Sequence, residues 1–411
     1  MTRTLLFTPV TFNLAETTRM IEVARACRDR WRCVFGVYEP EYVHLIEGAG
    51  FEVRTLTPIF TPEQVAQVMA VDQGRGFRHP YTADLTRRRV QAERELIREI
   101  GAEAVVMGTN VTSLLSARAE GVPLFYVVPF ALTEPHVAQS RRLRLVPGES
   151  FRDRFIDTVA SAAVRAVYQR MRWTPKSFKV VAREVGVEPP NSMAGLFSGD
   201  WTLLTVMPHE LNGFVLPETY RRVGPIFAHL DGDVPQEVLD LAAQDKPLVY
   251  LALGSSGNRK TAVGAARALG KLDINVVAPI RQYLQPGDSL PANVHVVDLL
   301  PAHKLGGVVD AAVLHGGQGT IQTACATGVP FVGMGMQPEQ TWNVWVYEQQ
   351  GNAVCLQPRD VTRRVFTDSV LRVLHDPAVR AAADSVRREY EGTDGARETA
   401  RVIGEVLSPA Q

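Results

Sequence analysis

Short apolar runs rich in Val, Leu and Phe alternate along this chain with longer segments of helical period. Continuous apolar runs of this length are typical of strands buried on both faces, and parallel neighbours need a crossover helix between them. The runs predict strands at 4–10, 33–38, 51–56, 104–108, 124–128, 201–207, 247–253, 274–279, 294–298, 311–314, 330–333 and 353–356. The alternation therefore predicts the α/β class, with doubly wound, Rossmann-like parallel sheets.

The length of 411 residues exceeds what one hydrophobic core usually organises. The stretch 220–246 is rich in Gly, Pro and Asp, which is typical of a linker between domains. We therefore predict an N-terminal domain at 1–224 and a C-terminal domain at 225–381, with a cleft between them. We expect the charged last helix, at about 382–411, to pack back on the first domain, and we interpret 140–191 as a helical insertion.

Charge and composition exclude several classes of protein. Lys plus Arg equals Asp plus Glu at 44 each, so no overall charge favours nucleic acid or a membrane as partner. No apolar stretch approaches the ~20 residues of a membrane span. The N-terminus resembles a buried strand and not a signal peptide. The four cysteines lack metal-ligand spacing. We expect a cytoplasmic protein without a metal site.

The segment His315-Gly316-Gly317-Gln318-Gly319-Thr320 follows a predicted strand and precedes a predicted helix. A helix N-terminus carries unpaired N–H groups and a partial positive charge, and glycines let an anion approach the backbone. His315 adds a side-chain donor and Thr320 a hydroxyl. The segment predicts a phosphate site, although a plain strand-to-helix turn is the alternative.

A second glycine-rich segment, Gly254-Ser255-Ser256-Gly257, closes the first strand of the second half. Parallel sheets bind ligands outside the carboxyl ends of their strands. Ser255 and Ser256 are therefore candidates for contacts with a phosphate or a sugar at the same sheet edge.

The stretch 308–354, which continues through Thr327-Gly328-Val329-Pro330 and Pro338-Glu339-Gln340-Thr341-Trp342-Asn343, resembles the donor-binding signature of the UDP-glycosyltransferases. This family of natural-product and lipid glycosyltransferases has the glycosyltransferase-B fold. The resemblance implies that His315 and the amides of Gly317 to Thr320 hold a nucleoside diphosphate, and that Glu339 and Gln340 reach sugar hydroxyls. It also places Gly254, Ser255, Ser256, Leu300 and Asn343 at the donor site.

The chain departs from the family pattern where the nucleoside would bind. Leu299 stands where many members carry a tryptophan that stacks on uracil, and Thr323 stands where many carry a ribose-binding glutamate. These residues leave open whether the donor is a UDP, dTDP or GDP sugar, and we favour UDP or dTDP. The donor is a co-substrate and no cofactor is implied. Since a helix N-terminus can replace a cation at a diphosphate, we expect metal independence.

The resemblance also implies a catalytic dyad, and this chain lacks both members. Glu16 stands at the position of the usual histidine and Gly108 at that of the aspartate. A partly desolvated glutamate can itself act as general base. The alternative is that Glu16 is an ordinary acidic residue at a helix N-terminus. Arg87, Arg88 and Arg89 are interpreted as a solvated helix face.

These features predict an enzyme that transfers a sugar, with inversion, from a nucleoside diphosphate sugar to a small acceptor such as a secondary metabolite. The first domain is expected to bind the acceptor. Two alternatives stay open: a catalytically silent sugar-nucleotide-binding homologue that acts as a partner or regulator, and a sugar-nucleotide 2-epimerase. No nucleic acid partner is expected, and a homodimer stays open.

Overall fold

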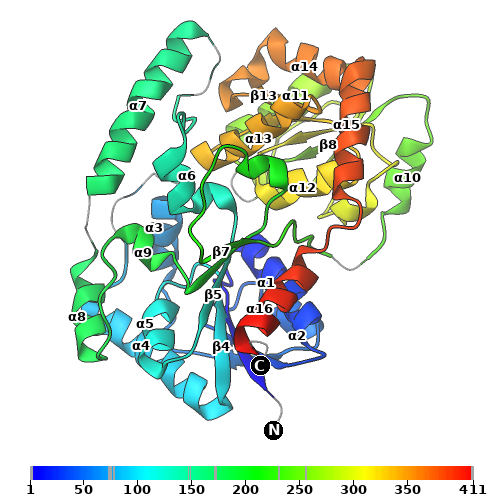
Figure 1. The fold of residues 1–411 in the computed structure, drawn as a ribbon. Coiled ribbons are helices and arrows are strands. Elements are labelled where there is room, and N and C mark those ends of the chain that lie inside the picture. Colours follow the sequence, from blue (N-terminus) through cyan, green and yellow to red (C-terminus); the bar gives the residue numbers. More distant parts are fainter. Residues whose placement is uncertain are drawn as a thin grey trace. The chain divides into compact units, whose positions relative to one another are not determined.

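The computed structural model describes residues 3–72, 76, 79–146, 148, 150–170, 174–229, 232–254 and 257–408 (Figure 1). The chain forms two compact units. Unit 1 comprises Met1–Gln139, Arg165–Ala228 and Asp394–Gln411, and unit 2 comprises Ser140–Val164 and His229–Thr393. Helix α7 (Phe151–Arg170) passes from unit 2 to unit 1. No described helix has both the length and the apolar composition needed to span a membrane.

Unit 1 is built on a parallel sheet of order β3-β2-β1-β4-β5-β6-β7. Its strands are β1 (Thr4–Thr8), β2 (Arg32–Val37), β3 (Glu52–Thr55), β4 (Ala102–Met107), β5 (Leu124–Val128), β6 (Trp201–Leu204) and β7 (Tyr220–Arg222). Among the strands that the structure describes, the sequence missed only β7. Its three residues include the exposed Arg221 and Arg222, so no apolar run marks it.

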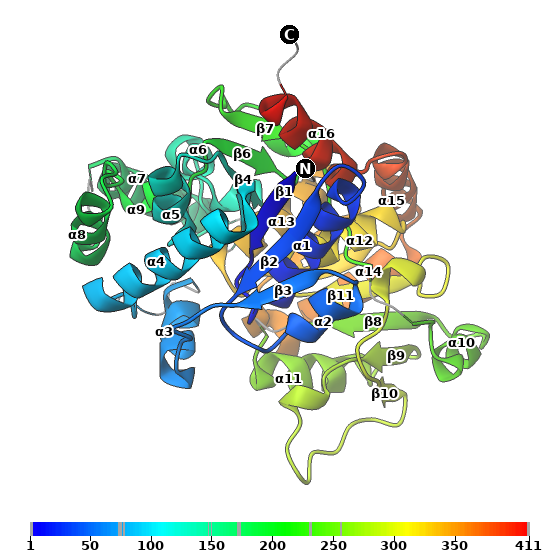
Figure 2. The same ribbon diagram turned by 90° about the horizontal axis from the view of Figure 1, so that it is seen from below.

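Helices cover both faces of this sheet (Figure 2). On one face α1 (Leu14–Cys27), α2 (Val43–Gly48) and α16 (Gly395–Leu407) share a core with alternate strand residues such as Phe7 and Phe35. On the other lie α4 (Ala83–Ile100), α5 (Ser113–Glu120) and α8 (Lys176–Glu184). The remaining helices are α3 (Pro62–Asp72), α6 (Glu134–Gln139), α9 (Met193–Leu196), η1 (Phe130–Leu132) and η2 (Pro208–Leu211).

Unit 2 repeats the winding in a parallel sheet of order β10-β9-β8-β11-β12-β13. Its strands are β8 (Leu248–Ala252), β9 (Asn275–Ala278), β10 (Val294–Val296), β11 (Ala311–Leu314), β12 (Phe331–Met334) and β13 (Ala353–Leu356). Its helices are α10 (Gln236–Ala242), α11 (Arg259–Leu269), η3 (Arg281–Tyr283), η4 (Ala302–Lys304), α12 (Gln318–Ala326), α13 (Pro338–Gln350), η5 (Pro358–Thr362), α14 (Arg364–His375) and α15 (Pro377–Tyr390). Two doubly wound sheets confirm the predicted fold class.

The C-terminal region contains two helices where the sequence predicted one from about 382 to 407. Helix α15 ends at Tyr390, Gly392 follows with a φ of +77°, and the side chain of Asp394 caps α16. Only α16 belongs to unit 1, where Ala400 and Ile403 join the core beside α1. The compact units also differ from the predicted limits in placing Ser140–Val164 in unit 2.

Candidate active site

The strand order of unit 2 places a switch point between β8 and β11, because the connections from these neighbours continue to opposite sides of the sheet. Ligands of doubly wound folds bind at the carboxyl ends of strands at such a point. Gly254 lies two residues beyond β8, and His315 directly follows β11. The two glycine-rich segments predicted to bind a diphosphate therefore meet at one sheet edge.

Two glycines pack against the imidazole of His315. A Cβ atom on Gly254 would lie 2.7 Å from Cε1 of His315, and one on Gly317 would lie 2.4 Å from Nε2. Gly254 also has a φ of +54°, a backbone conformation that favours glycine. A side chain at either position would displace the ring, so these glycines fix where His315 lies.

The helices that follow β11 and β12 begin without a side-chain cap. Gly317, the N-cap residue of α12, has no side chain, and Gln337 makes no cap hydrogen bond at α13. By contrast, Asn258 caps α11 by accepting from the Thr261 N–H. Because uncapped first-turn N–H groups attract anions, α12 and α13 present the stronger anion-binding ends.

Burial lowers the pKa of His315 to about 4, although the carbonyl of Ala252 acts in the opposite direction. The ring is therefore neutral near pH 7 and carries one N–H. A neutral imidazole can donate one hydrogen bond to a phosphate, and a bound anion would raise its pKa.

This low pKa predicts a stability that falls in acid. The unfolded chain binds a proton at histidine below about pH 6.5, whereas the folded ring does so only near pH 4. We expect His315 to make its full contribution to the free energy of unfolding above about pH 6.5. This contribution should fall by about 3 kcal/mol as the pH decreases to about 4. Urea unfolding of the wild type and His315→Gln across this pH range measures the difference. Equal pH dependence in the two proteins would contradict the prediction.

Gln340 and Asn343 hold the backbone around the predicted phosphate site. The Gln340 Oε1 accepts from the Met336 N–H at 2.9 Å, and the Asn343 Nδ2 donates to the Gly316 carbonyl at 3.1 Å. Both side chains are buried. Glu339 is half-buried, and the Gln337 amide, with its nitrogen toward Glu339, lies 3.0 and 3.2 Å from the carboxylate oxygens. Direct contact of these residues with a sugar stays a prediction.

The remaining predicted donor residues differ in exposure. Leu299 is 59% exposed, whereas the Leu300 side chain is buried in the core. Gly319 is exposed, while Gln318 and Thr320 are half-buried in the first turn of α12. The Thr323 hydroxyl donates to the Gly319 carbonyl at 2.8 Å. Ser255 and Ser256 lie outside the described residues.

Unit 1 has the equivalent switch point between β1 and β4, and the carboxylate of Glu16 bridges the two strand ends. Its Oε1 accepts from the Val10 N–H at 2.6 Å and from the Thr109 N–H at 2.9 Å. Its Oε2 accepts from the Thr109 hydroxyl at 2.6 Å. A Cβ atom on Gly108 would lie 1.9 Å from Oε1, so only glycine leaves room for this carboxylate.

Glu16 lies in the first turn of α1, where Asn13 caps the helix by accepting from the Glu16 N–H. The side chain turns toward the strand ends, so it does more than offset the helix dipole. Burial raises its pKa, and the hydrogen bonds from Thr109 and Val10 and the nearby Arg19 charge act in the opposite direction. A carboxylate with a raised pKa is a better proton acceptor than an exposed one.

The comparisons with known proteins concern the family and the fold. Residues 265–405 match the family model described as erythromycin biosynthesis protein CIII-like, C-terminal domain. The PGL/p-HBAD biosynthesis glycosyltransferase of Mycobacterium tuberculosis (strain ATCC 25177 / H37Ra) is 26% identical over 383 residues, which cover 92% of this chain and 86% of that protein. The chain is a glycosyltransferase with the glycosyltransferase-B fold, and it is similar to the glycosyltransferases of natural-product biosynthesis.

Two solved glycosyltransferases share the fold of this enzyme. The glycotransferase of kitacinnamycin is 19% identical, with a TM-score of 0.74 over 99% of this chain and 100% of that one. The glycosyltransferase VinC, solved in complex with dTDP, is 19% identical, with a TM-score of 0.69 over the same shares of the two chains. The predicted family resemblance and the enzyme class are confirmed.

Sequence reasoning misplaced one arginine of this glycosyltransferase. The sequence predicts a solvated position for Arg89, but its side chain is only 2% exposed. Its Nη2 pairs with Glu39 at 2.7 Å, and its guanidinium lies between the rings of Tyr38 and Phe60. The run of three consecutive arginines hid the inward position of Arg89. The helical period of α4 could have indicated this position, because Val90 and Glu93 are also buried.

Proposed function

We propose that this glycosyltransferase transfers a sugar, with inversion, from a nucleoside diphosphate sugar to a hydroxyl group of a small secondary metabolite. The observation that carries the donor assignment is the neutral imidazole of His315, held against Gly254 and Gly317 at an uncapped helix N-terminus. The N–H groups and the imidazole N–H would hold the diphosphate without requiring another cation. The same donors would stabilise the diphosphate as it leaves.

We propose UDP or dTDP as the nucleotide. The exposed Leu299 offers an apolar contact where a tryptophan would stack on uracil, and an aliphatic contact is compatible with the methyl group of thymine. The relative VinC was solved with dTDP, which supports the same choice. Thr323 presents a hydroxyl already engaged with a backbone carbonyl, so ribose recognition rests on other groups.

The reaction step assigned to Glu16 is general base catalysis. The oxygen of the acceptor hydroxyl would attack the anomeric carbon, the bond from this carbon to the phosphate oxygen would break, and the proton would pass to Glu16. Oε1 already accepts two backbone N–H groups, whereas Oε2 accepts one hydroxyl. Oε2 therefore keeps a lone pair and is the proposed proton acceptor.

Nucleotide binding tests the donor assignment without knowledge of the acceptor. We expect UDP or dTDP to raise the thermal unfolding temperature more than GDP or ADP, because a ligand at 100 times its Kd stabilises the folded state by about 2.7 kcal/mol. The same nucleotide should lose most of its effect on His315→Ala. A response that is equal for all four nucleotides, or unchanged in His315→Ala, would overturn the assignment. Anomeric analysis of the transferred sugar would then test inversion.

A further inference from the structure

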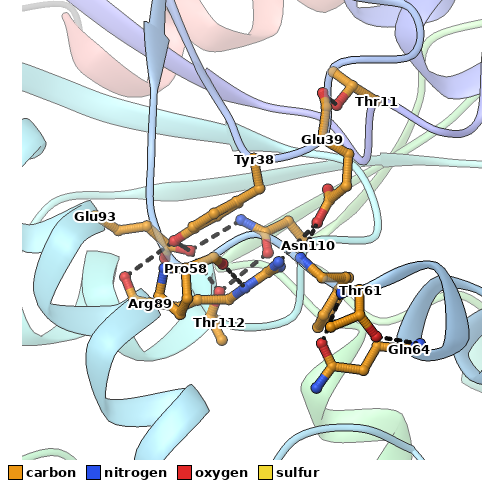
Figure 3. A network of polar contacts seen from close by, with 11 residues as sticks. Thr11, Tyr38, Glu39, Pro58, Thr61, Gln64, Arg89, Glu93, Asn110 and Thr112 are labelled. Carbon is orange, nitrogen blue, oxygen red and sulfur yellow. Dashed lines mark hydrogen bonds and ion pairs between the residues drawn. The ribbon is translucent and has the colours of Figure 1, made fainter.

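A second buried glutamate lies beneath the strand ends of unit 1. Glu93 on α4 is 1% exposed, and its carboxylate accepts four hydrogen bonds. Oε1 accepts from the Tyr38 hydroxyl at 2.9 Å, the Asn110 amide at 3.0 Å and the Thr112 hydroxyl at 2.5 Å (Figure 3). Oε2 accepts from the Ser116 hydroxyl at 2.6 Å. Every donor is neutral.

The two arginines nearest Glu93 on α4, Arg89 and Arg94, form ion pairs with other carboxylates. Arg89, one helical turn before Glu93, pairs with Glu39, and its Nε donates to the Pro58 carbonyl at 3.0 Å (Figure 3). Among the described residues no Lys, Arg or His forms an ion pair with Glu93. Burying a carboxylate among neutral donors costs free energy that an apolar side chain in a helix–sheet core does not. Stability alone therefore does not explain Glu93.

Glu93 and Glu16 both accept hydrogen bonds from one short loop, residues 108–112, between β4 and α5. Thr109 directs its N–H and hydroxyl to Glu16, whereas Asn110 and Thr112 direct their side chains to Glu93. The loop has no regular secondary structure of its own. Its position relative to Glu16 is thus set largely by the side chains that bind Glu93.

We propose that Glu93 is a positioning residue, which fixes the loop 108–112 so that Thr109 orients the proton-accepting carboxylate of Glu16. This inference rests on the base role proposed for Glu16. Glu93 itself touches no substrate in this proposal. A displacement of a reacting group by about 1 Å can cost on the order of 100-fold in rate, so a loosened loop would lower kcat.

The proposal also concerns the proton affinity of Glu16. The charged and titratable groups that face Glu16 are Arg19 from the same helix and Tyr81, which lies before α4. Both belong to elements other than the loop, so their influence stays when the loop is loosened. The Thr109 hydrogen bonds that lower the pKa of Glu16 would weaken, and its pKa would rise.

Mild substitutions test the proposal without removing the buried carboxylate. Thr112→Val and Asn110→Ala each remove a polar group that donates to Glu93 and that has no described contact with Glu16. We expect each to lower kcat about 10-fold, to leave donor KM unchanged, and to move the acid limb of the pH–kcat profile up by about half a unit. A third variant, Glu93→Gln, replaces the carboxylate but keeps an oxygen toward the loop, so its kcat should stay within about 3-fold of that of the wild type.

Thr399→Val is the matched control. It also removes a buried hydroxyl of unit 1, one that donates to the Gly395 carbonyl at 2.7 Å on α16. We expect it to lower stability as Thr112→Val does while leaving kcat and the acid limb unchanged. An equal change in the acid limb for both Thr→Val variants, or none for Thr112→Val, would overturn the proposal.

A substrate-free measurement separates this proposal from the assigned reaction. Because Glu16 has a raised pKa, its contribution to stability is present at low pH and lost as pH rises through that pKa. The difference in unfolding free energy between Glu16→Gln and its parent, followed against pH, locates the pKa. This pKa should be higher in Thr112→Val than in the wild type. Absence of sugar transfer would overturn the proposed function, while an unchanged pKa would overturn the positioning role of Glu93.

Discussion

Glu16→Gln is expected to lower kcat for sugar transfer by about 10³-fold, since general base catalysis contributes between about 10² and 10⁴. The amide can keep the existing contacts. Its oxygen can accept from the N–H groups of Val10 and Thr109, and its nitrogen can donate to the Thr109 hydroxyl. The substitution therefore removes the proton acceptor and leaves its surroundings in place. Initial rates under saturating donor and acceptor measure the effect.

Two controls accompany this measurement. Nucleotide binding to unit 2 should be unchanged in Glu16→Gln, and its stability at neutral pH should not fall, because the buried carboxylate has a raised pKa and is costly to ionise. Undiminished transfer by a well-folded Glu16→Gln protein would eliminate Glu16 as the base. Glu16 would then be a structural bridge between β1 and β4.

Gly317→Ala is expected to weaken nucleoside diphosphate binding by about 10- to 100-fold, which corresponds to the loss of one charge-assisted hydrogen bond. The added Cβ atom would lie 2.4 Å from Nε2 of His315, so the ring must move away from the phosphate site. The backbone of Gly317, with a φ of −61°, itself accepts an alanine. Calorimetric titration with UDP and dTDP measures the change.

The effect should depend on the imidazole. In a His315→Ala background the added methyl group meets no ring, so Gly317→Ala should cause little further loss of affinity. Gly48→Ala is the control for the substitution type, because a Cβ atom there meets no atom within 4 Å. A large further loss in the His315→Ala background would show that Gly317 acts through its backbone and not through the position of His315.

The alternation of apolar runs and helical segments was sufficient to predict both sheets. Strands such as Leu248–Ala252 and Ala311–Leu314 are buried along their whole length, so their composition identifies them without knowledge of their neighbours. The segment from His315 to Thr320 indicated an anion site because a strand, a glycine turn and a helix N-terminus are consecutive in the chain. Features of this kind depend on local sequence, and sequence alone reveals them.

Contacts between distant residues required the tertiary structure. The family resemblance predicted Glu16 and Gly108 at the two dyad positions, but only the structure brings the Glu16 carboxylate into the space left by Gly108 and onto Thr109. The burial of Arg89 and the four donors around Glu93 also come from separate segments. The sequence by itself determined most of the elements, the fold class and the glycine-rich turn predicted to bind phosphate, because these follow from local periodicity and backbone chemistry. The tertiary structure decided the partners of the buried charged groups, because sheet order brings together residues far apart in the chain.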